Sequence, residues 1–223
     1  MLTDYHCHIL PAIDDGSDSL ETSDAMIAMM RGQGVERIVA TSHFYAHRER
    51  SVADFIEKRR SAFEKLSDKN NIFLGAEIAV EHGISEMKDI EKLAVEGTDL
   101  ILLELPYRSY ENWMSEEIYN ISSEYGLTVM LAHIHRYLEY YSKMEMENIL
   151  KTKAVFQINN EAFGSFFQKN FVKNLIKDDY PLVFGSDSHD IRSRKPNWDL
   201  LQKKCKREVI ERSDSVFDQH FSG

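Results

Sequence analysis

The stretch Asp4-Tyr5-His6-Cys7-His8 places two imidazoles two residues apart near the start of the chain. Residues two apart in an extended strand face the same side, so both rings can bind one metal ion. The run Leu100-Ile101-Leu102-Leu103 ends in Glu104, where a buried carboxylate is costly unless it is paired or bound to a metal. Similar apolar runs precede His43, Glu77, His133 and Asp187. The whole set of candidate metal ligands is His6, His8, Asp15, His43, Glu77, Glu104, His133, Asp187 and His189.

Helical patterns alternate with these apolar runs. A capping box at Asp18-Ser19-Leu20-Glu21 predicts a helix that ends near Gly32, and further helical patterns cover 52–67, 111–125, 144–151, 166–177 and 198–210. A strand–helix order sustained over about seven units predicts a parallel sheet. Because ligands arrive from nearly every strand, the sheet is expected to close into a barrel. The pattern fades from Ser213 onward, which predicts a frayed or loosely docked terminus.

The composition is that of an ordinary globular protein. With 223 residues, 43% hydrophobic and 29% charged, the chain is expected to form one domain spanning residues 1–223. A net charge of -10 disfavours nucleic acid as a partner. No run approaches the roughly 18 apolar residues of a membrane span, and no signal peptide precedes the metal motif, so we expect a cytoplasmic location. Two cysteines far apart in the sequence do not indicate a disulfide framework.

Several residues near the candidate ligands have predicted or open roles. Asp4 has the parity of the two imidazoles and is predicted to accept a hydrogen bond from one of them. Cys7 has the opposite parity and is predicted to be a thiol buried in the barrel wall. In Asp14-Asp15-Gly16 one carboxylate could coordinate while the other caps the next helix, and the spacing does not choose between them. His135 shares the parity of His133 and could be a second ligand there.

The ordered motifs resemble those of the PHP (polymerase and histidinol phosphatase) metal-hydrolase superfamily. They are His6-Cys7-His8, Asp14-Asp15-Gly16, Thr41-Ser42-His43, Gly75-Ala76-Glu77, Glu104, His133 with Arg136 and Tyr137, and Ser186-Asp187-Ser188-His189. Within this superfamily the chain is similar to the bacterial manganese-dependent tyrosine-protein phosphatases encoded with capsule and exopolysaccharide genes. Their opening resembles His6 to Gly16 almost letter for letter, and Gln157-Ile158-Asn159 and Ser193-Arg194 also match.

The resemblance implies an α/β fold, a distorted (β/α)7 TIM-like barrel, with a site for three divalent cations. Asp15 rather than Asp14 falls on a ligand position, and the other candidate ligands fall on the remaining ones. Arg136 and Arg194 fall where the family holds phosphate, a role that suits the planar guanidinium group. Mn is the expected metal, and Fe or Zn also suits the donor set. The family usually has Glu where this chain has His135, which is therefore left out of the ligand set.

The activity implied is hydrolysis of a phosphomonoester by water whose pKa the metals lower. The expected substrate is phosphotyrosine on a protein, such as the cognate bacterial tyrosine kinase that controls capsule or exopolysaccharide synthesis. A first alternative is the same chemistry on a small phosphomonoester such as histidinol phosphate. A second is a non-catalytic, metal-binding regulatory domain, which the complete ligand set disfavours.

Two other enzyme classes fit the sequence poorly, and the role of two tyrosines in one loop is undecided. Amidohydrolases also begin with His-x-His, but they use a Lys between metals and end on a single Asp. A Cys-x5-Arg phosphatase loop is absent, since Ile13 follows Cys7 at that spacing and Glu211 follows Cys205. In the loop after Glu104, Tyr107 could either stack on a substrate tyrosine or pack at the surface, and the same holds for Tyr110.

Overall fold

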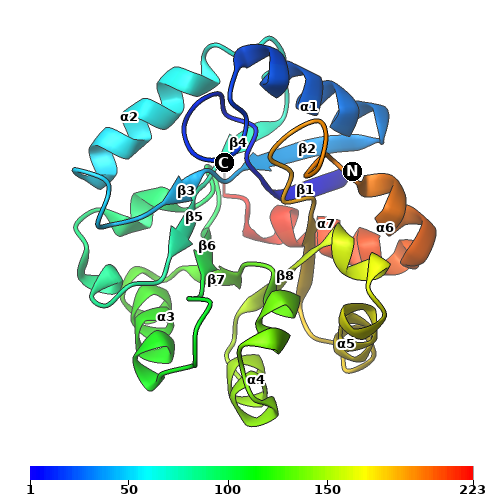
Figure 1. The fold of residues 1–223 in the computed structure, drawn as a ribbon. Helices are drawn as coiled ribbons and strands as arrows, with labels where there is room; N and C mark the ends of the chain where they lie inside the picture. Colours follow the sequence, from blue (N-terminus) through cyan, green and yellow to red (C-terminus); the bar gives the residue numbers. More distant parts are fainter. Residues whose placement is uncertain (223) are drawn as a thin grey trace.

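The protein, described here for residues 1–222 from a computed structural model, consists of parallel strands surrounded by helices (Figure 1). The strands are β1 (Leu2–Cys7), β2 (Val35–Ala40), β3 (His43–Phe44), β4 (Ile72–Leu74), β5 (Glu77–Ala79), β6 (Leu100–Glu104), β7 (Thr128–Leu131), β8 (Val155–Asn159) and β9 (Leu182–Gly185). The α-helices are α1 (Leu20–Gly32), α2 (Val52–Phe63), α3 (Asn112–Tyr125), α4 (Lys143–Leu150), α5 (Phe166–Lys177), α6 (Trp198–Lys204) and α7 (Arg207–His220). Short 3-10 turns are η1 (Ile84–Glu86), η2 (Ile90–Leu93), η3 (Ile134–Glu139) and η4 (Asn160–Gly164). No helix within residues 1–222 is long and apolar enough to cross a membrane.

The strands close into a distorted barrel. They pair in the orders β1-β2-β4 and β3-β5-β6-β7-β8-β9, and every pairing between these strands is parallel. β2 and β3 are two halves of one strand interrupted at residues 41–42, and β4 and β5 are related in the same way. The amide of Gly75 donates to the carbonyl of Ala40 at 2.8 Å, and the amide of Asp187 donates to the carbonyl of His6 at 2.7 Å. The first bond bridges the interruption and the second joins β9 back to β1, which confirms the predicted seven-stranded barrel.

Successive side chains along a strand contribute alternately to two apolar layers. On β6, Leu100 and Leu102 belong to the cluster inside the barrel, whereas Ile101 and Leu103 belong to the layer between the barrel and the helices. All four of these side chains are fully buried. This period of two is the pattern expected of a strand that is covered on both faces.

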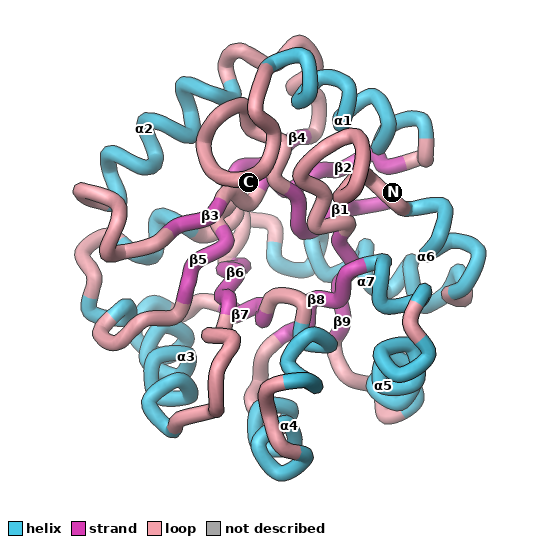
Figure 2. Tube along the Cα trace, viewed as in Figure 1, coloured by secondary structure: helices cyan, strands magenta, loops and turns pink. Residues whose placement is uncertain are grey.

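The C-terminal segment closes one end of the barrel, so the predicted loose terminus from Ser213 onward is wrong for residues up to 222. Helix α7 crosses behind the strands in Figure 1, while the loops that leave the strands gather at the end facing the viewer (Figure 2). The hydroxyl of Tyr5 donates to the carbonyl of Ser213 at 2.8 Å and accepts from the amide of Phe217 at 2.7 Å. Val216 and Phe217 join the cluster inside the barrel, and their burial supplies the reason that this segment is ordered as a helix.

Several helix boundaries differ from the prediction. Ser19 rather than Asp18 caps α1, because its side chain accepts the amide of Thr22, and the helix ends at Gly32 as expected. The helix predicted over 52–67 ends at Phe63. The helix predicted over 198–210 is divided at residues 205–206 into α6 and α7, because the chain turns there to pass beneath the barrel.

Candidate metal centre

An irregularity in β1 sets the direction of the first two candidate ligands. The pairing of β1 with β2 shifts register between Asp4 and Cys7, so the simple alternation of side chains does not hold there. The Nε2 atoms of His6 and His8 lie 3.2 Å apart at the open end of the barrel. Cys7 points into the wall, as predicted: its Sγ lies 3.4 Å from the carbonyl of Val39, and burial raises the pKa of the thiol well above its usual range.

Asp4 has a different role from the one predicted. Its carboxylate accepts the backbone amides of His6 at 3.1 Å and Ser186 at 2.9 Å, and the indole Nε1–H of Trp198 at 2.8 Å. No hydrogen bond joins it to an imidazole within residues 1–222. The register shift in β1 explains the error, because it turns Asp4 toward α6 instead of the metal centre. Asp4 therefore ties β1, the end of β9 and α6 together through their backbones.

Glu77 lies at the middle of the candidate ligands. Its Oε2 lies 3.0 Å from His6 Nε2, 3.2 Å from His8 Nε2 and 3.2 Å from His43 Nδ1. Its Oε1 lies 2.8 Å from His133 Nε2. Burial alone would raise the pKa of this carboxyl, but the surrounding imidazoles, His6 foremost, hold the pKa well below its usual range. An ionised carboxylate among imidazoles is an arrangement that can bridge two cations.

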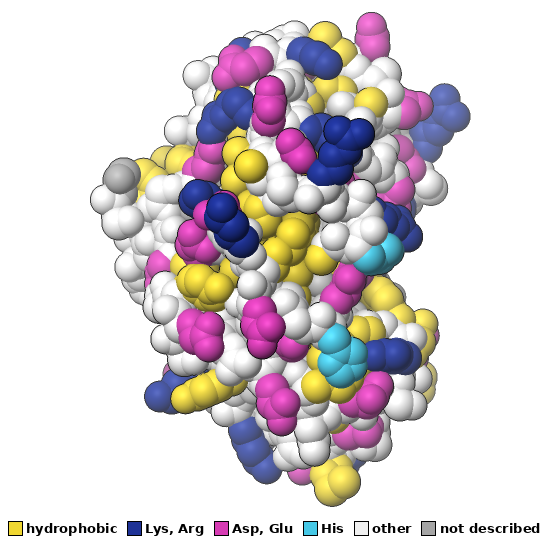
Figure 3. All heavy atoms as spheres, turned by 90° about the vertical axis from the view of Figure 1, so that its left-hand side faces the viewer, with side chains coloured by type: hydrophobic (Ala, Val, Ile, Leu, Met, Phe, Trp, Pro, Cys, Tyr) yellow, Lys and Arg dark blue, Asp and Glu magenta, His cyan; other side chains and the backbone are white. Residues whose placement is uncertain are grey.

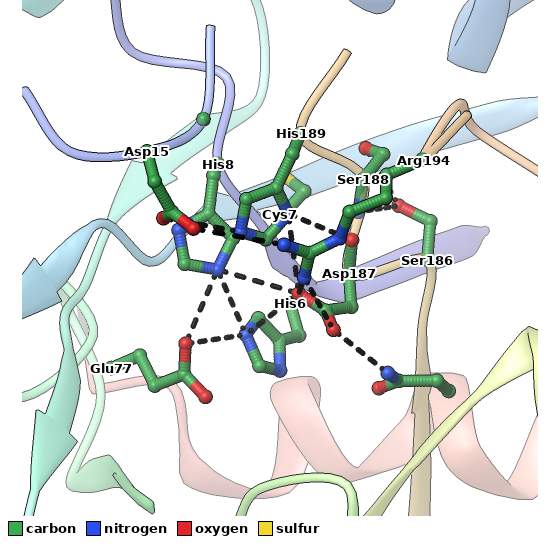
Figure 4. A network of polar contacts seen from close by, with 12 residues as sticks. His6, Cys7, His8, Asp15, Glu77, Ser186, Asp187, Ser188, His189 and Arg194 are labelled. Carbon is green, nitrogen blue, oxygen red and sulfur yellow. Dashed lines mark hydrogen bonds and ion pairs between the residues drawn. The ribbon is translucent and has the colours of Figure 1, made fainter. Parts of the chain in front are cut away.

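Asp187 occupies the other side of the histidine pair. Its Oδ1 lies 3.6 Å from His6 Nε2 and 3.5 Å from His8 Nε2. Its Oδ2 lies 2.8 Å from Arg136 Nη1 and 3.2 Å from Arg194 Nη2. Figure 4 shows Arg194 extending from the loop after β9 toward this carboxylate. Two guanidinium groups therefore contact the carboxylate of Asp187 at the edge of the group of candidate ligands.

The structure distinguishes the two neighbouring aspartates that spacing alone could not separate. Asp15 Oδ1 lies 3.4 Å from His43 Nε2 and 3.4 Å from His189 Nε2, and this side chain is 63% exposed. Asp14 Oδ2 instead lies 2.8 Å from His8 Nδ1 and accepts the backbone amide of His43 at 2.8 Å. Asp15 thus faces the other candidate ligands, while Asp14 orients one of them from behind.

The donor atoms form three overlapping clusters that could hold metal ions. Within each cluster the atoms lie within 4.8 Å of one another, and the clusters are His8, Asp15, His43 and His189; His6, His8 and Asp187; and His43, Glu77 and Glu104. His133 lies against two of these carboxylates, 2.8 Å from Glu77 and 3.4 Å from Glu104. All predicted candidate ligands are therefore brought together at the carboxyl end of the barrel.

The chemistry of these donors fits divalent cations. Within the described part of the chain the buried Nδ1 of His43 and Nε2 of His189 make no hydrogen bond, although carboxylate oxygens of Glu77 and Asp15 lie 3.2 Å and 3.4 Å away, respectively. Imidazole nitrogens and carboxylate oxygens that face one another without forming hydrogen bonds are expected where a cation binds between them. A mixed set of imidazole nitrogens and carboxylate oxygens suits Mn, Fe or Zn.

Two polar residues on β8 support the centre, and sequence reasoning assigned them no role. Gln157 Oε1 lies 3.0 Å from His6 Nδ1 and accepts the amide of His133 at 2.7 Å. Gln157 Nε2 donates to Asn159 at 2.9 Å, and Asn159 Nδ2 donates to Asp187 at 2.9 Å. The signal that could have found them is their polarity inside a fully buried strand.

His135, whose role the sequence left open, lies outside the three clusters. It is fully buried, and neither ring nitrogen has a hydrogen-bond partner among residues 1–222. Its Nε2 is 3.9 Å from the carboxylate of Glu161. Burial lowers the pKa of His135 to about 4. Glu161 itself bonds the guanidinium of Arg136 at 2.5 Å, so His135 packs behind the group that fixes this arginine.

The backbone is strained at two candidate ligands. Asp187 has φ +48° and His133 has φ +30°, in the left-handed region that residues other than glycine seldom adopt. Such conformations cost on the order of 1–3 kcal/mol and are common where a site dictates the backbone. The backbone of Gly185 also lies very close to His6, since a Cβ on Gly185 would be 2.7 Å from the Cβ of His6. A larger residue would not fit at this position.

The fold and the clusters together define a β/α barrel protein with clusters of potential metal ligands at the carboxyl ends of its strands. More narrowly, the chain belongs to the CpsB/CapC family of capsular polysaccharide synthesis proteins, whose model matches residues 2–219. It is 30% identical to the tyrosine-protein phosphatase CpsB of Streptococcus pneumoniae over 225 residues, covering 91% of this chain and 90% of that protein. It is 25% identical to the tyrosine-protein phosphatase YwqE of Bacillus subtilis (strain 168) over 205 residues, covering 86% of this chain and 79% of that protein.

A solved structure supports the same fold. It comes from work on YwqE from Bacillus subtilis and CpsB from Streptococcus pneumoniae, described as unique metal-dependent tyrosine phosphatases. The match has a TM-score of 0.76 at 21% identity and covers 98% of this chain and 95% of that chain. The comparisons confirm the family resemblance and the distorted (β/α)7 barrel that the sequence predicted.

Proposed function

We propose that this chain is a metal-dependent protein-tyrosine phosphatase, a phosphoric monoester hydrolase acting on phosphotyrosine in a protein. The observation that carries the proposal is the convergence of the candidate ligands with Arg136 and Arg194 around Asp187. The names of the relatives support the same reaction. We further propose one domain over residues 1–223, a cytoplasmic location, and a bacterial tyrosine kinase of capsule or exopolysaccharide synthesis as substrate.

The contacts support a specific assignment of ligands to three divalent cations, for which Mn is the proposed metal. His6, His8, Glu77 and Asp187 would hold the first, Glu77, Glu104 and His133 the second, and Asp15, His43 and His189 the third. Glu77 would be a ligand in both the first and the second set, because its two oxygens face different imidazoles. When bound, such cations supply Lewis acidity and lower the pKa of water.

The protein's own groups orient the site and bind phosphate. Asp14 and Gln157 each lie against an Nδ1 atom, of His8 and His6 respectively. A proton held at Nδ1 leaves the Nε2 lone pair of each ring free for a metal. Arg136 and Arg194 would bind phosphoryl oxygens through their planar forks and balance the negative charge that develops during transfer.

The test is hydrolysis of a phosphotyrosine peptide by metal-stripped protein reconstituted with Mn. The critical variant combines Asp187→Ala with His189→Ala. A matched control combines Asp199→Ala with His220→Ala, which removes the same residue types outside the metal centre. Metal content is measured for all three proteins, and histidinol phosphate is assayed in parallel.

The proposal predicts peptide turnover that disappears in the critical variant, together with lost metal, and persists in the control. Turnover of histidinol phosphate alone would assign the protein to small phosphomonoesters. Metal binding without turnover of either substrate would identify a non-catalytic regulatory domain instead.

A further inference from the structure

A groove leads away from the candidate metal centre on the side of β3, β5 and β6. It has a volume of about 550 Å³, and the loops after these strands and the start of α3 line it. We call it the lateral groove, and its characteristic residues are Tyr45, His47, His82, Tyr107, Arg108 and Trp113. Glu104, a candidate metal ligand, also lines it, so the groove opens onto the metal centre.

The inner part of the lateral groove has aromatic walls tied to candidate ligands. The ring of Tyr45 stacks on His43 with centroids 5.2 Å apart and planes 27° apart. The ring of Tyr107 stacks on His133 at 5.8 Å and 21°, and its hydroxyl lies 3.2 Å from His133 Nδ1. Each wall is therefore positioned by a residue of the metal centre.

Trp113 provides a further aromatic surface. Its ring stacks on His82 with centroids 3.8 Å apart, and the guanidinium carbon of Arg108 lies 5.6 Å from the ring centroid. The indole Nε1 is buried and has no hydrogen-bond partner in residues 1–222. His47 and His82 are both exposed. Figure 3 shows one face of the protein, on which exposed His side chains have basic, acidic and hydrophobic neighbours.

Tyr110, the other tyrosine of this loop, does not line the groove. Its hydroxyl bonds Ser115, and its ring packs edge-on against Tyr141 at 5.8 Å. Of the two open interpretations of the loop tyrosines, surface packing therefore describes Tyr110. Tyr107 remains 41% exposed and faces the groove.

We infer that the lateral groove binds the aromatic ring of phosphotyrosine while the phosphate lies at the metal centre. This inference rests on the proposed phosphatase function and deepens it by naming what selects an aryl over an alkyl ester. Aromatic walls attract a ring beyond simple burial of area, and an alkyl phosphate such as phosphoserine does not reach or stack on them. A groove of this volume lies in the range of ligand-binding clefts.

The test compares two peptides that differ only in carrying phosphotyrosine or phosphoserine. For each Mn-reconstituted protein, the ratio of kcat/KM between the two peptides measures aryl selectivity. Trp113→Ala removes the aromatic surface, and Trp113→Phe keeps a ring, which separates lost stacking from a folding defect. Tyr119→Ala is the matched control, since Tyr119 lies on the same helix, is 69% exposed and lies outside the groove. Calorimetric titration with a non-hydrolysable phosphonate analogue of the phosphotyrosine peptide measures binding without turnover.

We expect the selectivity ratio to fall about tenfold in Trp113→Ala, mainly through KM for the phosphotyrosine peptide. Trp113→Phe should keep most of the ratio, and Tyr119→Ala should keep all of it. An unchanged ratio in Trp113→Ala, or equal turnover of both peptides by the unaltered protein, would overturn the inference and leave the phosphatase function intact. If neither peptide is hydrolysed, the proposed function fails. The phosphonate titration then tests separately whether the groove binds the aromatic ring. In that case equal affinity of Trp113→Ala and the unaltered protein refutes the groove, and weaker affinity of the variant supports it.

Discussion

The two ends of the barrel use the same strands for opposite purposes. At the closed end Tyr5 and Phe217 fill the interior with apolar contacts beneath α7. At the open end, one residue further along β1, His6 begins a cluster of imidazoles and carboxylates. At the closed end the polar groups of Tyr5 are hydrogen-bonded within the apolar packing. At the open end two candidate ligands, Asp187 and His133, have strained backbone, and buried imidazole nitrogens of His43 and His189 lack hydrogen-bond partners among residues 1–222.

This difference indicates a division of roles along each strand. Apolar burial at the closed end contributes stability, and the open end retains arrangements that cost stability in the absence of metal. Substitutions at the closed end should therefore change unfolding with little effect on the reaction. Substitutions at the open end should change metal binding and the reaction with smaller effects on folding.

The largest effect is expected for Phe217→Ala at the closed end. Phe217 is 2% exposed and lies in the cluster inside the barrel. Loss of its ring should lower the free energy of unfolding by about 3–5 kcal/mol, the usual cost of a Phe→Ala cavity. Urea unfolding of the metal-free protein measures this value, while kcat per folded molecule should stay the same. A large fall in kcat without a change in stability would contradict the division of roles.

Glu77→Gln should have the next largest effect, at the open end. The substitution removes a charge that touches four imidazoles, so metal content and turnover should fall by more than about 100-fold. Elemental analysis and peptide hydrolysis measure the two quantities, and exposed Glu86→Gln is a control for the change of charge. The free energy of unfolding of the metal-free protein should change less than in Phe217→Ala. A larger loss would show that Glu77 is chiefly structural.

A smaller effect is expected for Asp14→Asn, which sharpens the distinction between orienting a ligand and being one. Asp14 holds His8 Nδ1 from behind, so its loss should lower metal affinity and turnover by roughly 10- to 100-fold. Asp15→Asn is the matched partner, because Asp15 faces His43 and His189 directly. If loss of Asp14 proves more damaging than loss of Asp15, the proposed assignment of the two is reversed.

The sequence predicted those features that depend on neighbouring residues. Several candidate ligands at strand ends could be found because an apolar run precedes them, as Leu100 to Leu103 precedes Glu104. The parity rule failed for Asp4, because a register shift in β1 is set by pairing with β2 and leaves no mark in the local sequence. Gln157 was matched to the family without a role, because its contacts with His6 and His133 form only when β8 closes against distant strands.

The C-terminal helix shows the same limit at the closed end. Its apolar residues are few, so the pattern fades, yet Val216 and Phe217 are buried once the helix lies beneath the barrel. Ser213 likewise looks like a solvated residue but accepts the amide of Phe184 at 3.1 Å. Tertiary packing, which local periodicity does not encode, decides the structure of this segment.

The smallest effect concerns pH and the closed end. Burial raises the pKa of Asp214 from 3.8 to about 6, although the carboxylate accepts the amide of Thr3 at 2.7 Å. A raised pKa in the folded state means that stability is fully present below the ordinary pKa and is lost as pH rises through about 6. Asp214→Asn keeps an acceptor for the amide of Thr3 and removes the charge. Between pH 4 and 7 the free energy of unfolding of the variant should therefore rise relative to that of the unaltered protein. The side chain is partly exposed, so the expected gain is on the order of 1 kcal/mol.

Urea unfolding of both metal-free proteins at several pH values across this range measures the gain. Asp199→Asn, an exposed residue on α6, controls for the change in net charge. A constant difference between Asp214→Asn and the unaltered protein would show that burial at the closed end leaves the titration of Asp214 unaffected. A difference that grows with pH would show that ionisation of Asp214 destabilises the closed end. Both ends would then contain a destabilising polar group, and metal binding would be the property that distinguishes them.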